Sequence, residues 1–327
     1  MIYDCFTLFN ELDLLEIRLN VLYDYVDYFV IAEGNKTHTG KDKDLFFEQN
    51  KERFSKFENK IRYVKVEDFP DLSSSKSDAQ GNKWLYENYQ RDAIMRGLYD
   101  CKDDDIVIIS DLDEIPNPKA IQEYKDGICI LKQYTFYYSL NTINITNMYS
   151  KGAKICRYKD LINPLQEISQ KNQEYCAYSK YGLPTYLRFC TGKKITNGGW
   201  HFSYLGTVED IIKKRNSIVE QQFNTEKNMS PKEIQQTIDS GKDILGRDCK
   251  YVNLYFSNIY PDYLIENEKK YSKYINKTKQ KPFYFAMFRA KMQKIIAIRT
   301  ENKNGKKEKY LKLFGIKIKL YKGKVND

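Results

Sequence analysis

Apolar and polar residues follow two alternating patterns along the first part of the chain. Four short, mostly apolar runs have the length and composition of strands: residues 3–9, 27–34, 61–66 and 106–109. Three segments between these runs repeat apolar residues at helical spacing: residues 10–22, 46–57 and 84–99. Strands that alternate with helices predict a mostly parallel sheet with helices on its faces, so we expect an α/β fold.

The sequence also predicts the cap of the first helix and a change of pattern after the fourth strand. Asn10 stands in the N-cap position of the first helix, with Asp13 placed as the acid of a capping box. Further along the chain the pattern changes. Residues 128–140 and 154–158 predict antiparallel strands rather than another strand and helix.

A cluster of carboxylates follows the most apolar strand. The four apolar residues 106–109 predict a strand buried on both faces, and Asp111, Asp113 and Glu114 come directly after it. Ligands of open α/β sheets bind at the carboxyl ends of strands, and paired carboxylates suit a divalent cation that also binds phosphate. The alternative is a polar turn in which Asp113 or Glu114 caps a helix that begins near Asn117.

Two further positions are candidates for binding a ligand at this edge of the sheet. Glu33 and Gly34 end the second strand at the same edge of the sheet, where Glu33 can bond a ribose or base and Gly34 admits a close ligand. The alternative for Glu33 is a solvated acid in a loop. Arg91, on the third predicted helix, can bind a diphosphate bidentately, or it can pair with Glu87 one turn away.

A glycine-rich segment at residues 196–206 contains Trp200 and His201. Glycines beside an imidazole indicate close approach of the backbone, and the indole offers a ring face for stacking. We expect Trp200 to contact the ligand and His201 to contact the metal or a diphosphate. A purely structural histidine is the alternative.

The composition limits the classes of protein. No segment of the sequence has the pattern of a signal peptide or a membrane-spanning helix. Seven cysteines without a Cys-x-x-Cys pair favour reduced thiols over disulfides or a zinc site. We therefore expect a cytoplasmic protein, either free in solution or peripheral at the inner face of a membrane.

Most of the positive charge lies in a C-terminal extension, residues 277–327, which we separate from a domain over residues 1–276. Residues 277–324 hold 14 Lys and 2 Arg but only two acids, so the rest of the chain is mildly acidic. This distribution argues against nucleic-acid binding by the main domain. The segment 281–299 predicts a helix with one apolar stripe: Phe285, Phe288, Met292, Ile295 and Ile296. We expect either packing on the domain or binding to an anionic membrane surface.

Several of these segments together resemble glycosyltransferase family 17. The resemblance rests on five segments in the family's order: residues 27–34, 37–40, 89–91, 108–116 and 199–206. It implies a GT-A fold, a nucleotide-sugar donor such as a UDP-sugar, and inversion at the anomeric carbon. It also implies Mn²⁺ or Mg²⁺ at Asp111 and Asp113. The family includes β-1,4-N-acetylglucosaminyltransferases, so the resemblance implies transfer of N-acetylglucosamine or a related hexosamine to a glycan or lipid-linked acceptor.

The residues leave the general base and two alternative functions open. Inversion needs a carboxylate that takes a proton from the acceptor, and the sequence offers four: Glu114, Glu167, Glu209 and Asp210. The first alternative is a haloacid-dehalogenase-type phosphohydrolase with Asp111 as nucleophile and Asp113 as acid/base. The second is a glycan-binding protein without catalytic activity.

Overall fold

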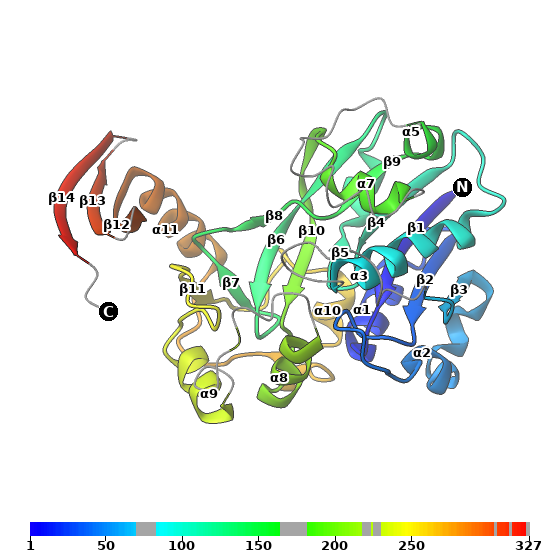
Figure 1. Cartoon of the computed structure of the whole chain (residues 1–327), viewed down its shortest axis with the longest axis horizontal. Helices are drawn as coiled ribbons and strands as arrows, with labels where there is room; N and C mark the ends of the chain where they lie inside the picture. The colour runs from blue at the N-terminus through cyan, green and yellow to red at the C-terminus, as the bar shows by residue number, and fades with distance from the viewer. Residues whose placement is uncertain are drawn as a thin grey trace.

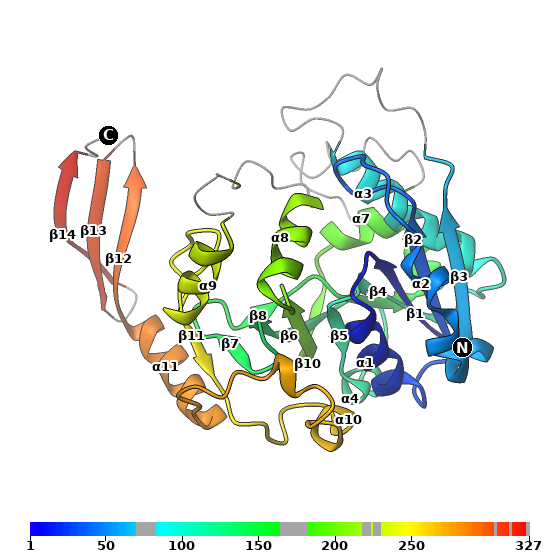
Figure 2. The same cartoon turned by 90° about the horizontal axis from the view of Figure 1, so that it is seen from below.

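The computed structural model of the chain describes residues 1–69, 83–163, 182–217, 224, 230–303, 306–313 and 316–324. Within these ranges, eleven strands form one central sheet. Helices flank this sheet in both views of the molecule (Figures 1 and 2). The predicted α/β fold with a large sheet is confirmed.

One half of the central sheet is parallel and Rossmann-like. It consists of four strands: β1 (Ile2–Leu8), β2 (Tyr28–Gly34), β3 (Ile61–Val66) and β4 (Ile106–Asp111). They lie in the order β3-β2-β1-β4, and every neighbouring pair is parallel. The chain moves from β1 to β2 and β3 on one side and then returns to place β4 on the other side. This reversal makes the carboxyl ends of β1 and β4 the expected ligand position.

The other half of the sheet is mixed, as the change of pattern after the fourth strand predicted. Its strands are β5 (Glu114–Pro116), β6 (Cys129–Tyr137), β7 (Thr142–Asn144), β8 (Tyr149–Ser150), β9 (Lys154–Arg157), β10 (Lys193–Ser203) and β11 (Tyr251–Asn253). Strand β9 pairs antiparallel with both β4 and β6 and so joins the two halves. Strand β10 runs parallel to β6 and antiparallel to β5. It thereby passes beside the turn that carries the carboxylates.

Apart from four of ten or more residues, the described α-helices are short. They are α1 (Leu12–Leu22), α2 (Phe46–Gln49), α3 (Lys83–Asp92), α4 (Pro118–Gln122), α5 (Tyr158–Ile162), α7 (Leu183–Phe189), α8 (Val208–Ser217), α9 (Pro231–Asp239), α10 (Asp262–Glu266) and α11 (Phe283–Ile295). Two of the predicted helices change form along their length. The segment 46–57 is a short α2 followed by the 3₁₀ helix Lys51–Lys60, and α3 is followed by the 3₁₀ helix Ala93–Leu98.

Two predicted helix caps are wrong. Glu11, not Asn10, is the N-cap residue of α1, and no side chain bonds the first turn there. Asp13 instead accepts a hydrogen bond from the Tyr274 hydroxyl at 2.6 Å. Helix α4 is capped by Asn117 itself, whose Oδ1 accepts from the Lys119 N–H at 3.0 Å, so neither carboxylate of the turn caps it.

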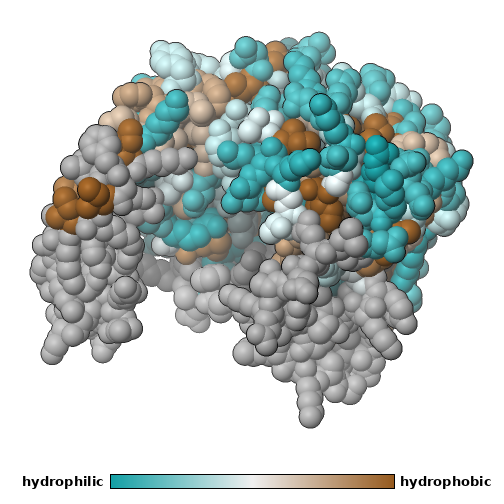
Figure 3. All heavy atoms as spheres, turned by 90° about the horizontal axis from the view of Figure 1, so that it is seen from above, coloured by the Kyte–Doolittle hydropathy of each residue, from teal (hydrophilic) through white to brown (hydrophobic). Residues whose placement is uncertain are grey.

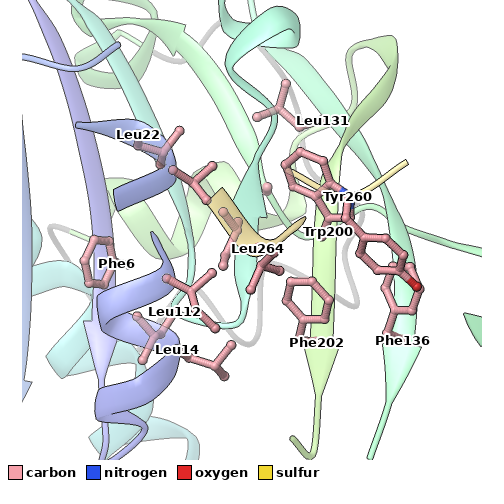
Figure 4. Close-up of a cluster of buried hydrophobic side chains, with 14 of the residues drawn as sticks. Phe6, Leu14, Leu22, Leu112, Leu131, Phe136, Trp200, Phe202, Tyr260 and Leu264 are labelled. Atoms are coloured by element: carbon pink, nitrogen blue, oxygen red, sulfur yellow. The ribbon is translucent and has the colours of Figure 1, made fainter. Parts of the chain in front are cut away.

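The main hydrophobic core lies between α1 and the sheet (Figure 4). Phe6 of β1 and Leu14 of α1 lie at one side of the cluster in the close-up, and Phe136 and Trp200 lie at the other. Trp200 is 4% exposed, and its Nε1 donates to the carbonyl of Ile259 at 2.7 Å. A ring packed in this way stabilises the fold and satisfies its single polar group.

Helix α1 also places a fully buried arginine under the carboxylate turn. Arg18 forms a bidentate pair with Asp4 of β1, with N–O distances of 2.6 and 2.8 Å. Its Nη1 donates to three main-chain carbonyls of the turn: Asp111 at 2.8 Å, Leu112 at 3.2 Å and Glu114 at 3.2 Å. Since these acceptors are buried or partly buried, one guanidinium satisfies groups that water does not readily reach.

The C-terminal extension begins with α11, which packs on the body through small residues. Ala286 is fully buried and Ala290 is 8% exposed, whereas Tyr284 and Phe288 are 75% and 61% exposed. The predicted apolar stripe is therefore wrong at Phe288, because the alanines allow closer packing than the phenylalanine would. The described helices include none long and apolar enough to span a membrane.

A separate three-stranded antiparallel sheet follows α11. It contains β12 (Ile296–Lys303), β13 (Lys306–Leu313) and β14 (Ile316–Lys324). In Figures 1 and 2 this sheet extends away from the central sheet, on the far side of α11. Apolar residues and lysines alternate along β13 and β14, as expected for strands.

The Arg18 contacts predict a large loss of stability when this side chain is removed. Arg18→Met leaves the Asp4 carboxylate buried without a partner, which should lower the free energy of unfolding by about 3–5 kcal/mol. The control Arg96→Met breaks the exposed pair with Asp68 and should cost less than about 1 kcal/mol. Chemical denaturation measures both values. Equal losses in the two variants would contradict the role assigned to Arg18.

Candidate active site

A cavity of about 290 Å³ opens at the carboxyl ends of β1 and β4. Thr7 and Leu8 contribute from β1, and Asp111 and Asp113 contribute from β4 and the turn after it. Much of the remaining wall comes from α3, α7, β10 and α8, and Tyr137 of β6, His38 and Arg247 also line the cavity. The position is the one that the reversal of strand order predicts, so we call this space the donor cavity.

Asp111 is held by two arginines from different helices. Arg91 of α3 donates to Oδ1 and Arg188 of α7 donates to Oδ2, each at 2.8 Å. Burial alone would raise the pKa of Asp111, but the charges of Arg188 and Arg91 outweigh it and hold the pKa well below its usual range. Asp111 therefore stays ionised, and both arginines face the cavity.

Asp113 is paired with a lysine and a histidine. Lys214 of α8 donates to Oδ2 at 2.9 Å, and Nε2 of His201 lies 3.5 Å from Oδ1. Burial works against ionisation of Asp113, but Lys214 and His201 lower its pKa below the ordinary value. In return, burial lowers the pKa of His201 while Asp113 raises it, and the net shift is upward.

Arg91 makes the pair with Glu87 that the sequence offered as one alternative, and it also contacts the carboxylate turn. Its Nη2 donates to Glu87 at 3.0 Å, as expected for a pair one turn apart, and also to Asp111. Glu87 lies 3.4 Å from Nδ1 of His38, which also lines the donor cavity. Burial lowers the pKa of His38, and Glu87 offsets only part of that shift.

The structure contradicts the donor contacts expected at the end of β2. Glu33 is fully buried and accepts hydrogen bonds from the N–H groups of Phe46 and Phe47 at 2.6 and 3.1 Å. It also accepts from the Tyr63 hydroxyl at 2.9 Å, so its oxygens hold the start of α2 rather than a ribose. A Cβ at Gly34 would lie 2.7 Å from the Phe69 ring, so the close approach there is made by a side chain of the protein.

Trp200 is also wrong as a donor contact. Neighbouring residues of a strand point to opposite faces, so the buried Trp200 and the cavity-lining His201 cannot both face the donor. The tryptophan that does line the donor cavity is Trp84 of α3. Three residues of the glycine-rich segment line this cavity, His201, Ser203 and Tyr204, and Trp200 does not.

Three of the four expected general bases have other roles or positions. Glu114 is 3% exposed and accepts from Ser150 at 3.0 Å behind the turn. Asp210 caps α8, since its Oδ2 accepts from the N–H and the hydroxyl of Thr207 at 2.9 and 3.0 Å. Glu209 is exposed on α8 and lines neither the donor cavity nor its neighbour. Glu167 lies outside the described residues.

Glu11 is the carboxylate that sequence reasoning missed. A second cavity of about 230 Å³ shares Glu11, Tyr204 and Lys214 with the donor cavity, and we call it the neighbouring cavity. Oε1 of Glu11 lies 3.1 Å from Nζ of Lys214, which also contacts Asp113. Glu11 therefore stands where the two spaces meet. Its place directly after β1 was the available signal, but the helix-cap pattern drew attention to Asn10 and Asp13.

The donor set around the turn fits a divalent cation that shares its coordination with phosphate. Within the described residues, no group of three or more acidic, histidine or cysteine side chains could hold a metal ion by itself. Two carboxylates, Asp111 and Asp113, with phosphate and water in the other positions, suit Mg²⁺ or Mn²⁺.

His201 does not fit as a third ligand. A metal-bound histidine normally donates its other N–H to an acceptor. Nδ1 of His201 is buried and finds no partner among the described residues. The geometry suits a hydrogen bond from Nε2 to Asp113 instead, so the expected metal contact of His201 is not supported.

Comparisons with known proteins identify related chains. The model of a family described as glycosyltransferase family 17 matches residues 1–276. Human and rat proteins named beta-1,4-mannosyl-glycoprotein 4-beta-N-acetylglucosaminyltransferase are each 33% identical to this chain over 132 residues, 38% of this chain and 22% of theirs. The mouse protein of that name is 32% identical over the same length. The aligned part of the chain thus spans about a fifth of the length of these curated relatives.

The electrostatics of the donor cavity predict opposite titrations for the two histidines of this chain. In metal-free buffer, His201 should titrate above and His38 below the usual range. Asp113→Asn removes the charge that raises the pKa of His201, so only that titration should move to lower pH. Proton NMR of the two imidazoles measures both. Titration of both histidines at one pH, or no response to Asp113→Asn, would contradict the geometry.

Proposed function

This chain belongs to glycosyltransferase family 17, and from that premise we propose that it transfers N-acetylglucosamine from UDP-N-acetylglucosamine to an acceptor hydroxyl. The acceptor is a sugar of a glycan or of a lipid-linked glycan, and the anomeric carbon is inverted. The family expected from the sequence is confirmed. The alternative of a haloacid-dehalogenase-type phosphohydrolase is wrong, because the family model covers residues 1–276.

One observation carries the proposal: three cationic side chains converge on the carboxylate turn at the end of β4. Arg91, Arg188 and Lys214 all line the donor cavity and all contact Asp111 or Asp113. A nucleoside diphosphate leaves with increasing negative charge, and prepositioned cations stabilise that charge in the transition state. The planar guanidinium groups also match phosphate oxygens bidentately.

Asp111 and Asp113 support the same step. A Mn²⁺ or Mg²⁺ ion held by these two carboxylates would offset the charge of the diphosphate and orient it. His201 and Lys214 hold Asp113 ionised, so the carboxylate is ready for this task at neutral pH. Trp84, on the opposite helix α3, offers a ring to the base or the sugar.

We assign the general base to Glu11. An inverting displacement needs a carboxylate that reaches the acceptor hydroxyl on the side of the sugar away from the leaving group. Glu11 lies at the border of the donor cavity and the neighbouring cavity, where Tyr204 and Tyr274 offer ring faces to an acceptor sugar. The acceptor hydroxyl would pass its proton to Glu11 as its oxygen bonds to the anomeric carbon.

The proposed donor predicts metal-dependent release of UDP. The wild-type protein with UDP-N-acetylglucosamine and Mn²⁺ should release UDP slowly without acceptor and faster with a glycan acceptor. Asp113→Asn should keep the fold, because asparagine has the same size and keeps an oxygen for Lys214, and should lose most of this turnover, because it removes the charge. A coupled assay for UDP measures both reactions. Undiminished metal-dependent turnover in folded Asp113→Asn would rule out the assigned site.

The assignment of the base predicts a selective loss of turnover. Glu11→Gln should lower kcat by about 10²–10⁴-fold and leave the affinity for UDP nearly unchanged, because the base acts on the acceptor. Glu209→Gln, at an exposed position of α8, is the matched control and should retain activity. Asp210→Asn, which weakens a helix cap, should lower stability by about 1 kcal/mol instead. A normal kcat in Glu11→Gln would place the base elsewhere.

We also propose that the C-terminal extension binds an anionic membrane surface and keeps the enzyme at the inner face of a membrane. On the face shown in Figure 3, hydrophobic side chains of the described body occur only in small groups. The exposed Tyr284 and Phe288, with Ile316 and Ile318 at 68% and 44% exposure, remain as apolar contacts beside many lysines. Such a mixture suits the interface of an anionic bilayer.

The proposed attachment predicts a difference in sedimentation with vesicles. The full-length protein should sediment with phosphatidylglycerol vesicles at moderate salt, and a variant that ends at Ile295 and carries Tyr284→Ser and Phe288→Ser should not. That variant keeps α11 and its buried Ala286, so its donor hydrolysis should be unchanged. Neutral phosphatidylcholine vesicles are the control. Equal sedimentation of both proteins would exclude the attachment.

A further inference from the structure

A third cavity, larger than the other two, lies beside β10. Its volume is about 630 Å³, within the range of small-molecule sites. Its walls come from the end of α1, the start of α4, parts of β6, β8 and β10, and the segment that leads into α10. Figure 2 shows α1, α4 and α10 close together in the lower part of the molecule. The residues Thr196, Asn197 and Trp200 line this cavity, whereas His201 lines the donor cavity.

The glycine-rich segment forms a bulge that points into this third cavity. The register between β10 and β6 shifts between Ile195 and Gly199, and Asn197 has a φ of 55°. A Cβ at Gly198 would lie 2.5 Å from the main-chain nitrogen of Lys132. A Cβ at Gly199 would lie 2.1 Å from the carbonyl oxygen of Ile115. The two glycines therefore allow a bulge that exposes Asn197 at the cavity, and bulges commonly redirect side chains at functional sites.

The lining combines ring faces with unpaired polar groups. Six aromatic residues line the cavity: Tyr25, Tyr134, Tyr149, Trp200, Tyr260 and Tyr263. Asn197 and Asn258 are exposed, and their side chains make no hydrogen bond within the described residues. Tyr260 is 3% exposed, and its buried hydroxyl also lacks a partner there. Tyr260 thus contributes its ring to the lining, and the two exposed asparagines contribute polar groups that a ligand can reach.

The charges of the lining argue for a neutral ligand. Lys119, Lys132 and Asp262 are the charged residues among those that line the cavity. Nζ of Lys132 lies 3.9 Å from the centre of the Tyr149 ring and is thus engaged in a cation–π contact. The cavity lacks the clustered arginines of the donor cavity, which suit phosphate.

We propose that the third cavity binds a neutral oligosaccharide, separately from the site of transfer. Sugar rings carry apolar C–H faces, which stack on aromatic rings, and hydroxyl edges, which bond to amides and to tyrosine hydroxyls. The choice of a glycan rests on the proposed function, because a chain bound here by its distal sugars would stay near the enzyme between transfers.

The test titrates the wild type and two variants with chitotetraose and with mannotetraose. Saturation-transfer NMR measures the binding of each sugar. Asn197→Gly keeps the positive φ and removes only the side chain, and Tyr25→Ser removes an exposed ring at the end of α1. At least one tetrasaccharide should bind the wild type, and each variant should bind it about tenfold more weakly. The control variants Glu11→Gln and Glu209→Gln should bind it as the wild type does.

Three results would overturn the proposal. The first is that neither tetrasaccharide binds the wild type. The second is that Asn197→Gly and Tyr25→Ser bind the sugar as the wild type does. The third is that Glu11→Gln alone abolishes binding, which would place the sugar in the neighbouring cavity. Hydrolysis of UDP-N-acetylglucosamine, measured on the same proteins, separates the two claims. Sugar binding without hydrolysis would remove the proposed transfer and leave this site.

Discussion

The contact of Arg18 with the turn after β4 is the constraint on which the candidate site depends. The turn reverses the chain inside the molecule, so its carbonyls need donors that water does not readily supply. Arg18 provides them from α1 and is itself neutralised by Asp4 of β1. A buried ion pair is weak evidence for net stability. Here the ion pair sets a position, because Arg18 and Asp4 hold the carboxylate turn against β1 and α1.

The fixed turn explains why the donor cavity is electrostatically balanced. Asp111 and Asp113 each contact two cationic or protonatable side chains, and these reach the turn from three helices and a strand. Charges held in place by mutual contacts need little rearrangement when a diphosphate arrives, and such preorganisation lowers the cost of binding. Glu11 is linked to the same network through Lys214, which couples the position of the proposed base to the donor.

Local patterns in the sequence predicted the parallel half of the sheet and the carboxylate turn well, because strand composition and strand ends are local properties. The same patterns failed where the outcome depends on contacts between distant segments. Arg188 lies on α7, 77 positions beyond its partner Asp111, and no local signal marks it. Glu33 looked free at a strand end but is used by the start of α2.

The glycine-rich segment shows an error that depends on contacts between distant segments. Its sequence did not predict a strand, but Trp200 and His201 are neighbours on β10, where alternation makes them face different sides. Which side held the donor could not be read from the sequence, because it depends on the pairing of β10 with β5 and β6. The bulge at Asn197 arises from close packing of Gly198 against β6, which is also a tertiary contact.

The central claim is that the diphosphate of a UDP-sugar binds between the arginines and the carboxylate turn. Calorimetric titration of UDP and of uridine, with Mn²⁺ present, into the wild type and Arg188→Gln tests it most directly. The account predicts that UDP binds the wild type far more tightly than uridine does. It also predicts that Arg188→Gln weakens UDP by about 10- to 100-fold and leaves uridine unchanged. Equal affinities for UDP and uridine, or no effect of Arg188→Gln on UDP, would contradict it.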